Sequence, residues 1–328
     1  MMNKRKIYYT LHSGKNSKLA YYVGAYLRDL TPRWMLRPRL AAKLAAAEQR
    51  PDRDYIMDRV AYYNRLTPQT PFSREEWMEQ SVRLDQQRKM GQKVYYFDTM
   101  EYGRWFPGHL RWRIEPGDPR QLMTLPSLIK CRNLANDNGL SVLLNLNKVR
   151  HFLFVDDPKP WAQKRNEALF RGDLGARKEG RTVFMRRWYG HPAVDAGMTN
   201  HEGDEAWFRE KLTIGEQLQH KFIMSLEGND VASNLKWIMS SNSIAVTPRP
   251  TCETWFMEGR LKPDYHYIEV KPDFSDLEEK LHYYLEHQQE AEAIIAHAHE
   301  WVAQFQDKQR EDLISLLVLQ RYFELTNT

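Results

Sequence analysis

The stretch from Lys221 to Ser243 most constrains what this chain can fold into. Its first part, Phe222–Leu226, is a short apolar run of the length of a buried parallel strand. Gly228 then supplies a turn, and Asn229 or Asp230 is a suitable N-cap for a helix. The apolar residues that follow keep the spacing of one helix face: Val231, Ala232, Leu235, Ile238 and Met239.

A second apolar run at residues 244–247 follows, so the stretch predicts a βαβ unit. Polar residues gather where its first strand ends. Open α/β sheets bind ligands at such strand ends, and free N–H groups at a helix start favour phosphate. A purely structural βαβ corner explains the same pattern, and both interpretations stay open.

The size and composition describe a globular protein. The chain of 328 residues is long enough for two domains with a shared buried core, and 10 Trp, 17 Tyr and 13 Phe are available for burial. Cys131 and Cys252 have no metal-binding spacing, which indicates a reducing compartment. Residues 7–13 are too short and polar for a signal sequence, and no apolar run approaches a membrane span. We therefore expect a protein that works in the cytoplasm or lies against a membrane from the cytoplasmic side.

Positive charge is concentrated at the start of the chain. The net charge is +5, yet residues 1–50 contain eleven Lys and Arg against only Asp29 and Glu48. Within this stretch, Trp34, Met35, Leu36 and Leu40 alternate with Arg33, Arg37, Arg39 and Lys43. Such a segment suits an anionic lipid surface, an acidic substrate or nucleic acid, and a solvated basic face is the alternative.

The remaining pattern predicts an alternation of strands and helices. We expect strands at residues 6–11, 94–97, 127–132, 152–155, 168–172 and 266–270. We expect helices at residues 17–30, 55–64, 74–90, 277–285 and 290–325. Residues 103–126 form a long loop rich in Gly, Pro and Trp, and loops of that length are usually functional.

Five segments in order resemble glycosyltransferase family 90: Trp161-x-x-Lys164, Phe170-Arg-Gly172, Lys221-Phe222 through Ala232-Ser233, Trp255-Phe256 through His266-Tyr267, and Asp276-Leu277. This family includes protein O-glucosyltransferases, capsule-associated xylosyltransferases and bacterial proteins assigned to lipopolysaccharide core synthesis. The similarity covers residues 150–300, and upstream only bacterial members look similar, through Asp137-Asn138 and residues 142–151.

The resemblance implies an α/β fold of the GT-B type, with two Rossmann-like domains and a C-terminal helix that crosses back. The expected division is an acceptor-side domain at residues 1–150, a nucleotide-sugar domain at 151–300 and the helix at 301–328. The donor is expected to be a nucleotide-sugar, with UDP-sugar favoured, and no tightly bound cofactor is expected.

Donor-site residues carry over by motif. Arg171 matches the family arginine expected at the diphosphate, although an arginine at a strand end can equally pair with a carboxylate. Ser233 matches a hydroxyl at the first turn of the donor-site helix. The full predicted set is Arg171, Gly172, Lys221, Glu227, Gly228, Asp230, Ala232, Ser233 and Lys236. Eukaryotic members carry Arg-Gly where Glu227-Gly228 stands, so Lys221 or Lys236 is expected to supply the missing charge.

The characterised branches of the family invert the anomeric carbon, which requires a carboxylate to deprotonate the acceptor hydroxyl. Asp118 in Gly117-Asp118-Pro119 is the nearest match to the family's Arg-Asp-Tyr-Pro segment. Asp137 is the second candidate, and both residues suit simple turns as well. Asp156-Asp157 lacks the Asp-x-Asp spacing of metal-dependent glycosyltransferases, and no His or Cys cluster has ligand spacing, so no metal site is predicted.

The expected acceptor is the lipopolysaccharide core on lipid A, because the upstream match is to bacterial members. A capsule or protein acceptor is the alternative within the same class. Two non-enzymatic alternatives remain: a membrane-surface protein, and a nucleic-acid-binding protein suggested by the basic aromatic runs at 111–113 and 186–189. Because acidic residues nearly balance the basic ones, nucleic acid is not an expected partner.

Overall fold

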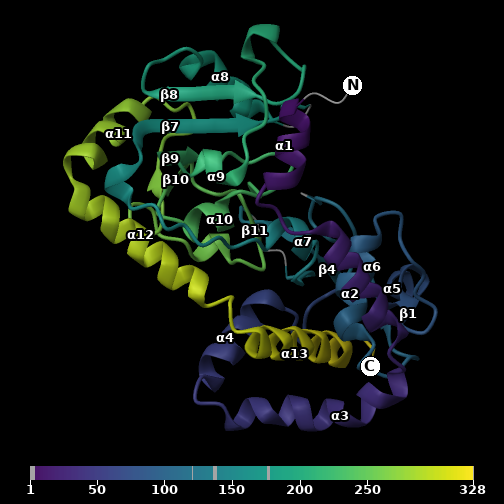
Figure 1. Ribbon diagram of the computed structural model, residues 1–328. Helices are drawn as coiled ribbons and strands as arrows, with labels where there is room; N and C mark the ends of the chain where they lie inside the picture. The colour runs from purple at the N-terminus through teal and green to yellow at the C-terminus, as the bar shows by residue number, and fades with distance from the viewer. Residues whose placement is uncertain (1–3, 120, 136–138, 176–177, 328) are drawn as a thin grey trace. The chain divides into compact units, whose positions relative to one another are not determined.

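The computed structural model describes residues 4–327 apart from 120, 136–138 and 176–177. The chain forms two compact units, each with mixed α/β structure (Figure 1). Unit 1 comprises the residues up to Asn16, Arg150–Pro250 and Glu258–Gln304. Unit 2 comprises Ser17–Val149, Thr251–Met257 and Phe305–Thr328.

Unit 1 is built on a parallel sheet of five strands in the order β12-β10-β9-β7-β8. The strands are β7 (Arg165–Gly172), β8 (Val194–Met198), β9 (His220–Met224), β10 (Ile244–Thr247) and β12 (Ile268–Glu269). From β7 the chain moves outward to β8 and then returns to β9 on the other side of β7. The direction of winding therefore reverses between β7 and β9.

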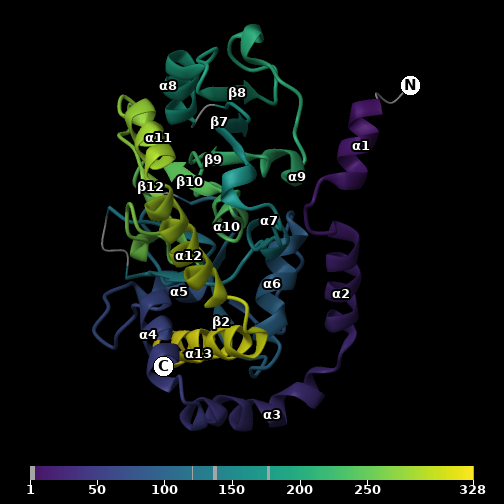
Figure 2. The same cartoon turned by 60° about the vertical axis from the view of Figure 1, so that its left-hand side comes forward.

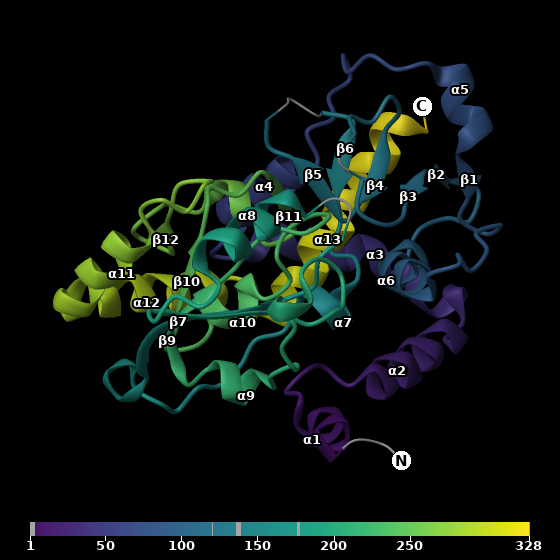
Figure 3. The same ribbon diagram turned by 90° about the horizontal axis from the view of Figure 1, so that it is seen from above.

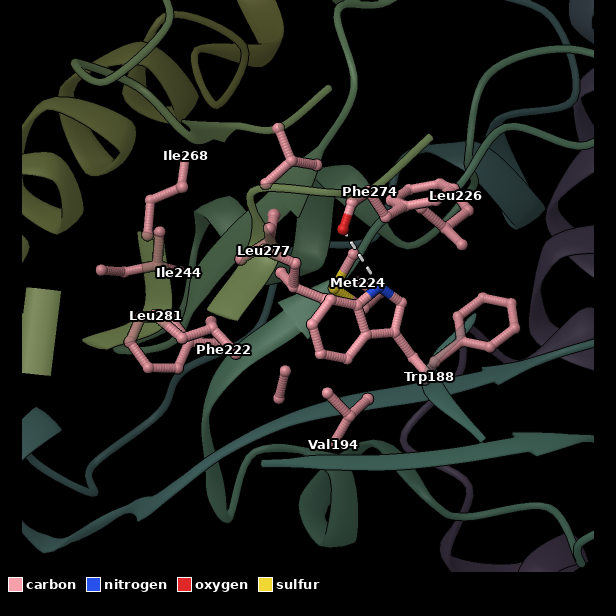
Figure 4. Close-up of a cluster of buried hydrophobic side chains, with 14 of the residues drawn as sticks. Trp188, Val194, Phe222, Met224, Leu226, Ile244, Ile268, Phe274, Leu277 and Leu281 are labelled. Atoms are coloured by element: carbon pink, nitrogen blue, oxygen red, sulfur yellow. Dashed lines mark hydrogen bonds between the residues drawn. The ribbon is translucent and has the colours of Figure 1, made fainter. Parts of the chain in front are cut away.

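The helices of unit 1 are α1 (Lys4–His12), α8 (Glu179–Trp188), α9 (Ile214–Gln217), α10 (Leu235–Met239), α11 (Leu277–Glu286) and α12 (Gln288–Ala303). Side chains from α8, α11 and α12 join alternate strand residues in one apolar core. Figure 4 shows Trp188 at its centre, where the indole Nε1 donates to the carbonyl oxygen of Phe274 at 3.2 Å. Phe222 and Met224 face this core, while Ile223 between them is buried on the other face. Burial on both faces explains why these strands read as continuous apolar runs.

Unit 2 is mainly helical, with α2 (Lys18–Leu30), α3 (Arg33–Ala45), α4 (Arg53–Tyr63), α5 (Arg74–Gln80), α6 (Lys93–Gly103) and α13 (Lys308–Thr326). Its parallel sheet contains β3 (Ile114–Glu115), β4 (Ser127–Ile129) and β6 (Ser141–Leu143). Two antiparallel pairs complete it: β1 (Val82–Arg83) with β2 (Arg111–Trp112), and β5 (Cys131–Asn133) with β11 (Cys252–Thr254). The short helix α7 (Lys148–His151) lies at the chain boundary between the units.

A buried ion pair ties α4 to α13 within unit 2. Arg59 on α4 is fully buried and donates to both carboxylate oxygens of Glu311 on α13. The same carboxylate accepts from the indole Nε1 of Trp255 at 2.6 Å. These partners satisfy the charges, and leaving either charge alone in the core would be costly.

Several sequence predictions are confirmed. Strands occupy residues 168–172 and 244–247, and β9 covers most of the predicted run 222–226. The helix predicted at 17–30 is α2, whose N-cap Ser17 accepts from the backbone N–H of Ala20 at 3.2 Å. Ser73 caps α5 in the same way, although that helix ends at Gln80 rather than at Met90.

Three strand predictions are wrong. Residues 6–11 lie in α1 and residues 94–97 lie in α6, while residues 152–155 form neither helix nor strand. The α6 segment is buried on nearly all sides, and a short apolar run that is buried all round has no periodicity to separate helix from strand. In α1, Arg5 pairs with Glu216 on α9 at 2.6 Å, a long-range contact that no local pattern reveals.

Two helix boundaries also differ. The helix after β9 begins at Leu235 with Asn234 at its N-cap position, so Asn229 and Asp230 lie in the irregular segment before it. The predicted helix at 290–325 is two helices, because the chain breaks after Ala303 and Asp307 caps α13 by accepting from the N–H of Arg310. None of the helices within the described residues has the length and apolar character of a membrane span.

Candidate functional site

A pocket of about 350 Å³ opens beyond the carboxyl ends of β7, β8 and β9 in unit 1. Arg171 and Gly172 end β7, Thr199 and Asn200 follow β8, and Leu226 follows β9. Ser233 and Asn234 line it from the turn before α10. The pocket thus lies where the winding of the sheet reverses, which is where doubly wound α/β sheets bind nucleotides.

The pocket lining is strongly basic. Lys15, Arg150, Arg171, Arg181 and Lys211 line it, and Asp173 is the carboxylate among the lining residues that the structure describes. Lys15, Arg150 and Lys211 are exposed. The side chains of Arg150 and Lys211 make no hydrogen bond or ion pair with the described part of the chain, so their charges are available to a ligand. A recessed site with this balance of charge attracts anions.

Arg171 lines the pocket but is already engaged by a carboxylate. Its guanidinium donates to both oxygens of Asp195, at 2.7 and 2.9 Å, and to the carbonyl oxygen of Phe170 at 2.9 Å. The ion pair orients the guanidinium at the end of β7 and partly neutralises it. A Cβ at the neighbouring Gly172 would lie 2.8 Å from the ring of Phe170, so a larger residue there would displace that ring.

Arg181 on α8 is a pocket residue that the motif argument missed. It donates to the carbonyl oxygens of Leu226 at 2.9 Å and Glu227 at 3.2 Å, and to the carboxylate of Asp173 at 3.0 Å. A Cβ at Gly228 would lie 3.1 Å from its Nη2. Burial lowers the pKa of Arg181. The only sequence signal was the general basic character of residues 161–187.

Arg181 therefore brings a cation to the backbone of Glu227-Gly228, a position that is not basic in the sequence. Lys221 and Lys236, the residues expected to supply this charge, do not line the pocket. The ammonium of Lys221 lies 5.1 Å from the ring centroid of Trp161, and burial lowers its pKa. Lys236 is fully buried and pairs with Glu258 at 2.8 Å.

Of the predicted donor-site residues, Arg171, Gly172 and Ser233 line the pocket, and the others do not. Gly228 donates its N–H to the carbonyl oxygen of Asp230 at 3.0 Å, which shapes the turn after β9. Asp230 and Ala232 are both buried. These residues build the turn that presents Ser233.

Asp118, the first candidate base, lies in unit 2 between β3 and β4 and is partly exposed. Its carboxylate accepts from the buried ammonium of Lys130. The preceding carbonyl of Gly117 accepts from the hydroxyl of Tyr95 at 3.1 Å. This anchored carboxylate has one oxygen in an ion pair and a side chain that reaches solvent. Asp137, the second candidate, lies outside the described residues.

The Asp156-Asp157 segment is organised by hydrogen bonds to the protein. Asp157 accepts from the ammonium of Lys164 at 2.6 Å and from the N–H of Asn242 at 3.0 Å. Asp156 is exposed. Among the described residues, no three His, Cys, Asp or Glu side chains are grouped so that they could hold a metal ion. Metal independence stays a prediction.

A basic pocket at the switch point of a doubly wound sheet is where α/β proteins commonly bind nucleotides, and comparison with known sequences assigns the class of this chain. Residues 147–328 match the family model for glycosyl transferase family 90. The chain belongs to glycosyltransferase family 90 and is a glycosyltransferase.

Named relatives agree with this assignment. The chain is 37% identical over 312 residues to O-glucosyltransferase LpsA of Dichelobacter nodosus, an alignment that spans 94% of this chain and 96% of that protein. It is 26% identical over 136 residues to protein O-glucosyltransferase 1 of Rattus norvegicus, which covers 38% of this chain and 33% of that protein. Protein O-glucosyltransferase 2 of Danio rerio is 25% identical over 140 residues, or 41% of this chain and 28% of that one.

Some motif residues that carry the family resemblance build the fold. Trp161 packs edge-on against Phe222 at a centroid distance of 5.1 Å. Lys164 pairs with Asp157 and donates to the carbonyl oxygen of Leu218. The motif residues of this chain thus belong partly to the core and partly to the pocket, and only the structure separates the two.

Proposed function

We propose that this chain transfers a glucosyl or related hexosyl group from a UDP-sugar to the core oligosaccharide of lipopolysaccharide. The observation that supports binding of a UDP-sugar donor is the basic pocket at the switch point between β7 and β9. The relative from Dichelobacter nodosus is named as an O-glucosyltransferase and aligns with nearly the whole of this chain, which supports glucosyl transfer.

The pocket chemistry suits a diphosphate. Its two phosphates carry negative charge that Arg150 and Lys211 are free to meet, while Arg171 and Arg181 are held in place by carboxylates and carbonyls. Charge-assisted hydrogen bonds from guanidinium to phosphate are among the stronger polar contacts in proteins. The hydroxyl of Ser233 adds a neutral polar contact for the remainder of the nucleotide. The amide of Asn200 bonds to the backbone of Leu174 at 2.8 and 2.9 Å and holds the lining in place.

We assign the donor to unit 1 and the acceptor to unit 2, in a GT-B type enzyme. In this proposal Asp118 is the general base, with Asp137 as the alternative. The carboxylate takes the proton of the acceptor hydroxyl, the hydroxyl oxygen forms a bond to the anomeric carbon, and the bond from that carbon to the diphosphate oxygen breaks. The configuration at the carbon inverts, and the cations of the pocket stabilise the negative charge on the departing UDP.

The lipopolysaccharide core is the acceptor that we favour over a capsule or protein acceptor. Nascent core on lipid A is anionic and held in a membrane, and the basic residues at the start of the chain suit such a partner. We place the reaction at the cytoplasmic face of the inner membrane.

The test compares lipopolysaccharide from a deletion strain with that of its parent by mass spectrometry. We expect a core that lacks one hexose, restored by the wild-type gene and not by a gene encoding Arg171→Ala. An unchanged core in a strain known to express the gene would reject the lipopolysaccharide acceptor. Titration of the purified protein with UDP by calorimetry tests the donor half separately, and absence of binding would reject it.

A further inference from the structure

Helix α2 has two faces of very different character. One face packs on α6, where the hydroxyl of Tyr21 donates to Asp98 at 2.7 Å and the ring of Tyr22 meets that of Phe97 at 6.0 Å. Ala25 on the same face is 2% exposed. Figures 2 and 3 show α2 alongside α6, with α3 continuing from its end. This inner face accounts for the stability of the helix within unit 2.

The outer face of α2 is an uncovered apolar stripe. Leu19, Val23, Leu27 and Leu30 follow helical spacing and are 76%, 51%, 64% and 78% exposed. Just beyond the helix, Trp34 on α3 is 74% exposed. Single exposed apolar residues are ordinary, but a continuous stripe of large ones marks a surface that meets a partner.

Positive charge surrounds this stripe. The α2–α3 segment, residues 18–45, contains Lys18, Arg28, Arg33, Arg37, Arg39 and Lys43. Its one carboxylate is Asp29, which accepts from the hydroxyl of Tyr96 at 3.2 Å and pairs with Lys89 at 3.6 Å. That carboxylate is therefore neutralised within unit 2. Arg28 pairs with Glu101 at 3.7 Å, and the exposed cations that remain on the α2–α3 segment are Lys18, Arg37 and Arg39.

We propose that the outer face of α2 and the start of α3 dock on an anionic lipid bilayer. Leu19, Leu27 and Leu30, with Trp34, would enter the boundary between headgroups and acyl chains, and the cations would meet the lipid phosphates. With 13 residues each, these helices lie on the surface rather than span it. The inference deepens the proposed function, since it gives the enzyme a route to a lipid-held acceptor.

A second copy of the chain is the competing occupant. A two-fold interface on this face would bring the cations of one copy against those of the other, and like charges across an interface oppose association. An anionic bilayer instead complements both the apolar stripe and the charge. From the sequence, Leu36 and Leu40 are expected to belong to the apolar surface of this segment. In the structure both are half-buried, and Leu36 lines a pocket within unit 2.

The experiment measures sedimentation of the full chain with vesicles of phosphatidylcholine, with and without about 30% phosphatidylglycerol. We expect binding to the anionic vesicles only, weakened by salt. The triple variant Leu19→Gln, Leu27→Gln, Leu30→Gln should bind at least tenfold more weakly. Arg37→Gln with Arg39→Gln should also weaken binding, by roughly fivefold for each charge removed. Leu122→Gln, which changes a leucine of unit 2 that is 50% exposed, is the matched control and should bind like wild type.

UDP titration and thermal melting of every variant show whether the fold is intact, because α2 lies outside the unit 1 pocket. Wild-type vesicle binding by a folded triple variant would overturn the proposal, as would absence of wild-type binding to anionic vesicles. A wild-type dimer in analytical ultracentrifugation that the triple variant abolishes would assign the face to a second copy. Vesicle binding without UDP binding would instead reject the proposed function and leave this inference standing.

Discussion

Asp195 holds the guanidinium of Arg171 by two hydrogen bonds of 2.7 and 2.9 Å at the end of β7. The pair fixes an arginine at the edge of a basic pocket before any ligand arrives. Arg171 is mostly buried, while Asp195 is about one-third exposed. The same arginine can therefore be a structural partner of Asp195 and a fixed phosphate contact, and mutation separates these two roles.

Replacing Arg171 by Ala should weaken UDP binding about ten- to hundredfold, since a hydrogen bond to a charged group contributes roughly 1.5–3 kcal/mol. Isothermal titration calorimetry measures the effect. Asp195→Asn is the matched control: it keeps an acceptor for the guanidinium but removes the competing negative charge, so UDP affinity should stay the same or rise. Unchanged UDP binding by Arg171→Ala would remove this residue from the donor site.

We expect Arg181, rather than Lys221 or Lys236, to supply the positive charge beside Glu227-Gly228. We expect Arg181→Ala to weaken UDP binding by about tenfold or more, because it removes a fixed charge from the pocket lining. Lys236→Met should instead lower the free energy of unfolding by about 3–5 kcal/mol, since it leaves Glu258 in a buried site without its lysine. Folded Lys236→Met should bind UDP like wild type. The reverse pattern in calorimetry and denaturant titration would return the role to Lys236.

Asp118→Asn should lower turnover by roughly 10²–10⁴, the usual contribution of a positioned general base. The amide oxygen can still accept from Lys130, so the local structure should persist. Donor binding should be nearly unchanged, because the pocket lies in unit 1. Rates of sugar transfer measured under saturating donor test this. Turnover within severalfold of wild type would pass the role to Asp137 or to another carboxylate.

Sugar transfer should persist in EDTA, because guanidinium and ammonium groups line the proposed diphosphate site. The measurement is turnover before and after chelation, with Mg²⁺ and Mn²⁺ added back. A complete loss of turnover that metal restores would contradict the prediction and would direct attention to Asp156, the exposed member of the Asp-Asp pair.

The free energy of unfolding should decrease in mild acid because His266 becomes protonated more readily in the unfolded chain. Burial, with smaller effects from the charges of His297 and Lys262, lowers the pKa of His266 to about 4. Its Nδ1 accepts from the N–H of Lys262 at 2.9 Å, which requires the unprotonated nitrogen. The unfolded chain binds this proton with the ordinary pKa of about 6.5, so unfolding takes up a proton at lower pH.

The contribution of His266 is therefore fully present above about pH 6.5 and is lost as the pH falls toward 4, in total about 1–2 kcal/mol after solvent screening. Denaturant titrations at several pH values measure it. His266→Asn keeps an acceptor for the Lys262 N–H but cannot titrate, so its free energy of unfolding should depend less on pH. Equal pH dependence in the two proteins would show that other groups dominate.

The sequence by itself determined the strands around Phe170, Phe222 and Val246, the start of α2 and membership of the glycosyltransferase family. These features are local. A short apolar run followed by Gly or a capping residue specifies a buried strand or a helix start through its own backbone preferences.

Tertiary structure decided what local pattern could not. Residues 94–97 are helical because α6 is buried on nearly all sides, which erases the periodicity that separates helix from strand. Lys236 is a core ion-pair residue and Arg181 a pocket residue, although both are basic side chains near the same motif. Whether a charge meets a ligand or a buried carboxylate depends on which distant segment packs against it, and that is set only when the chain folds.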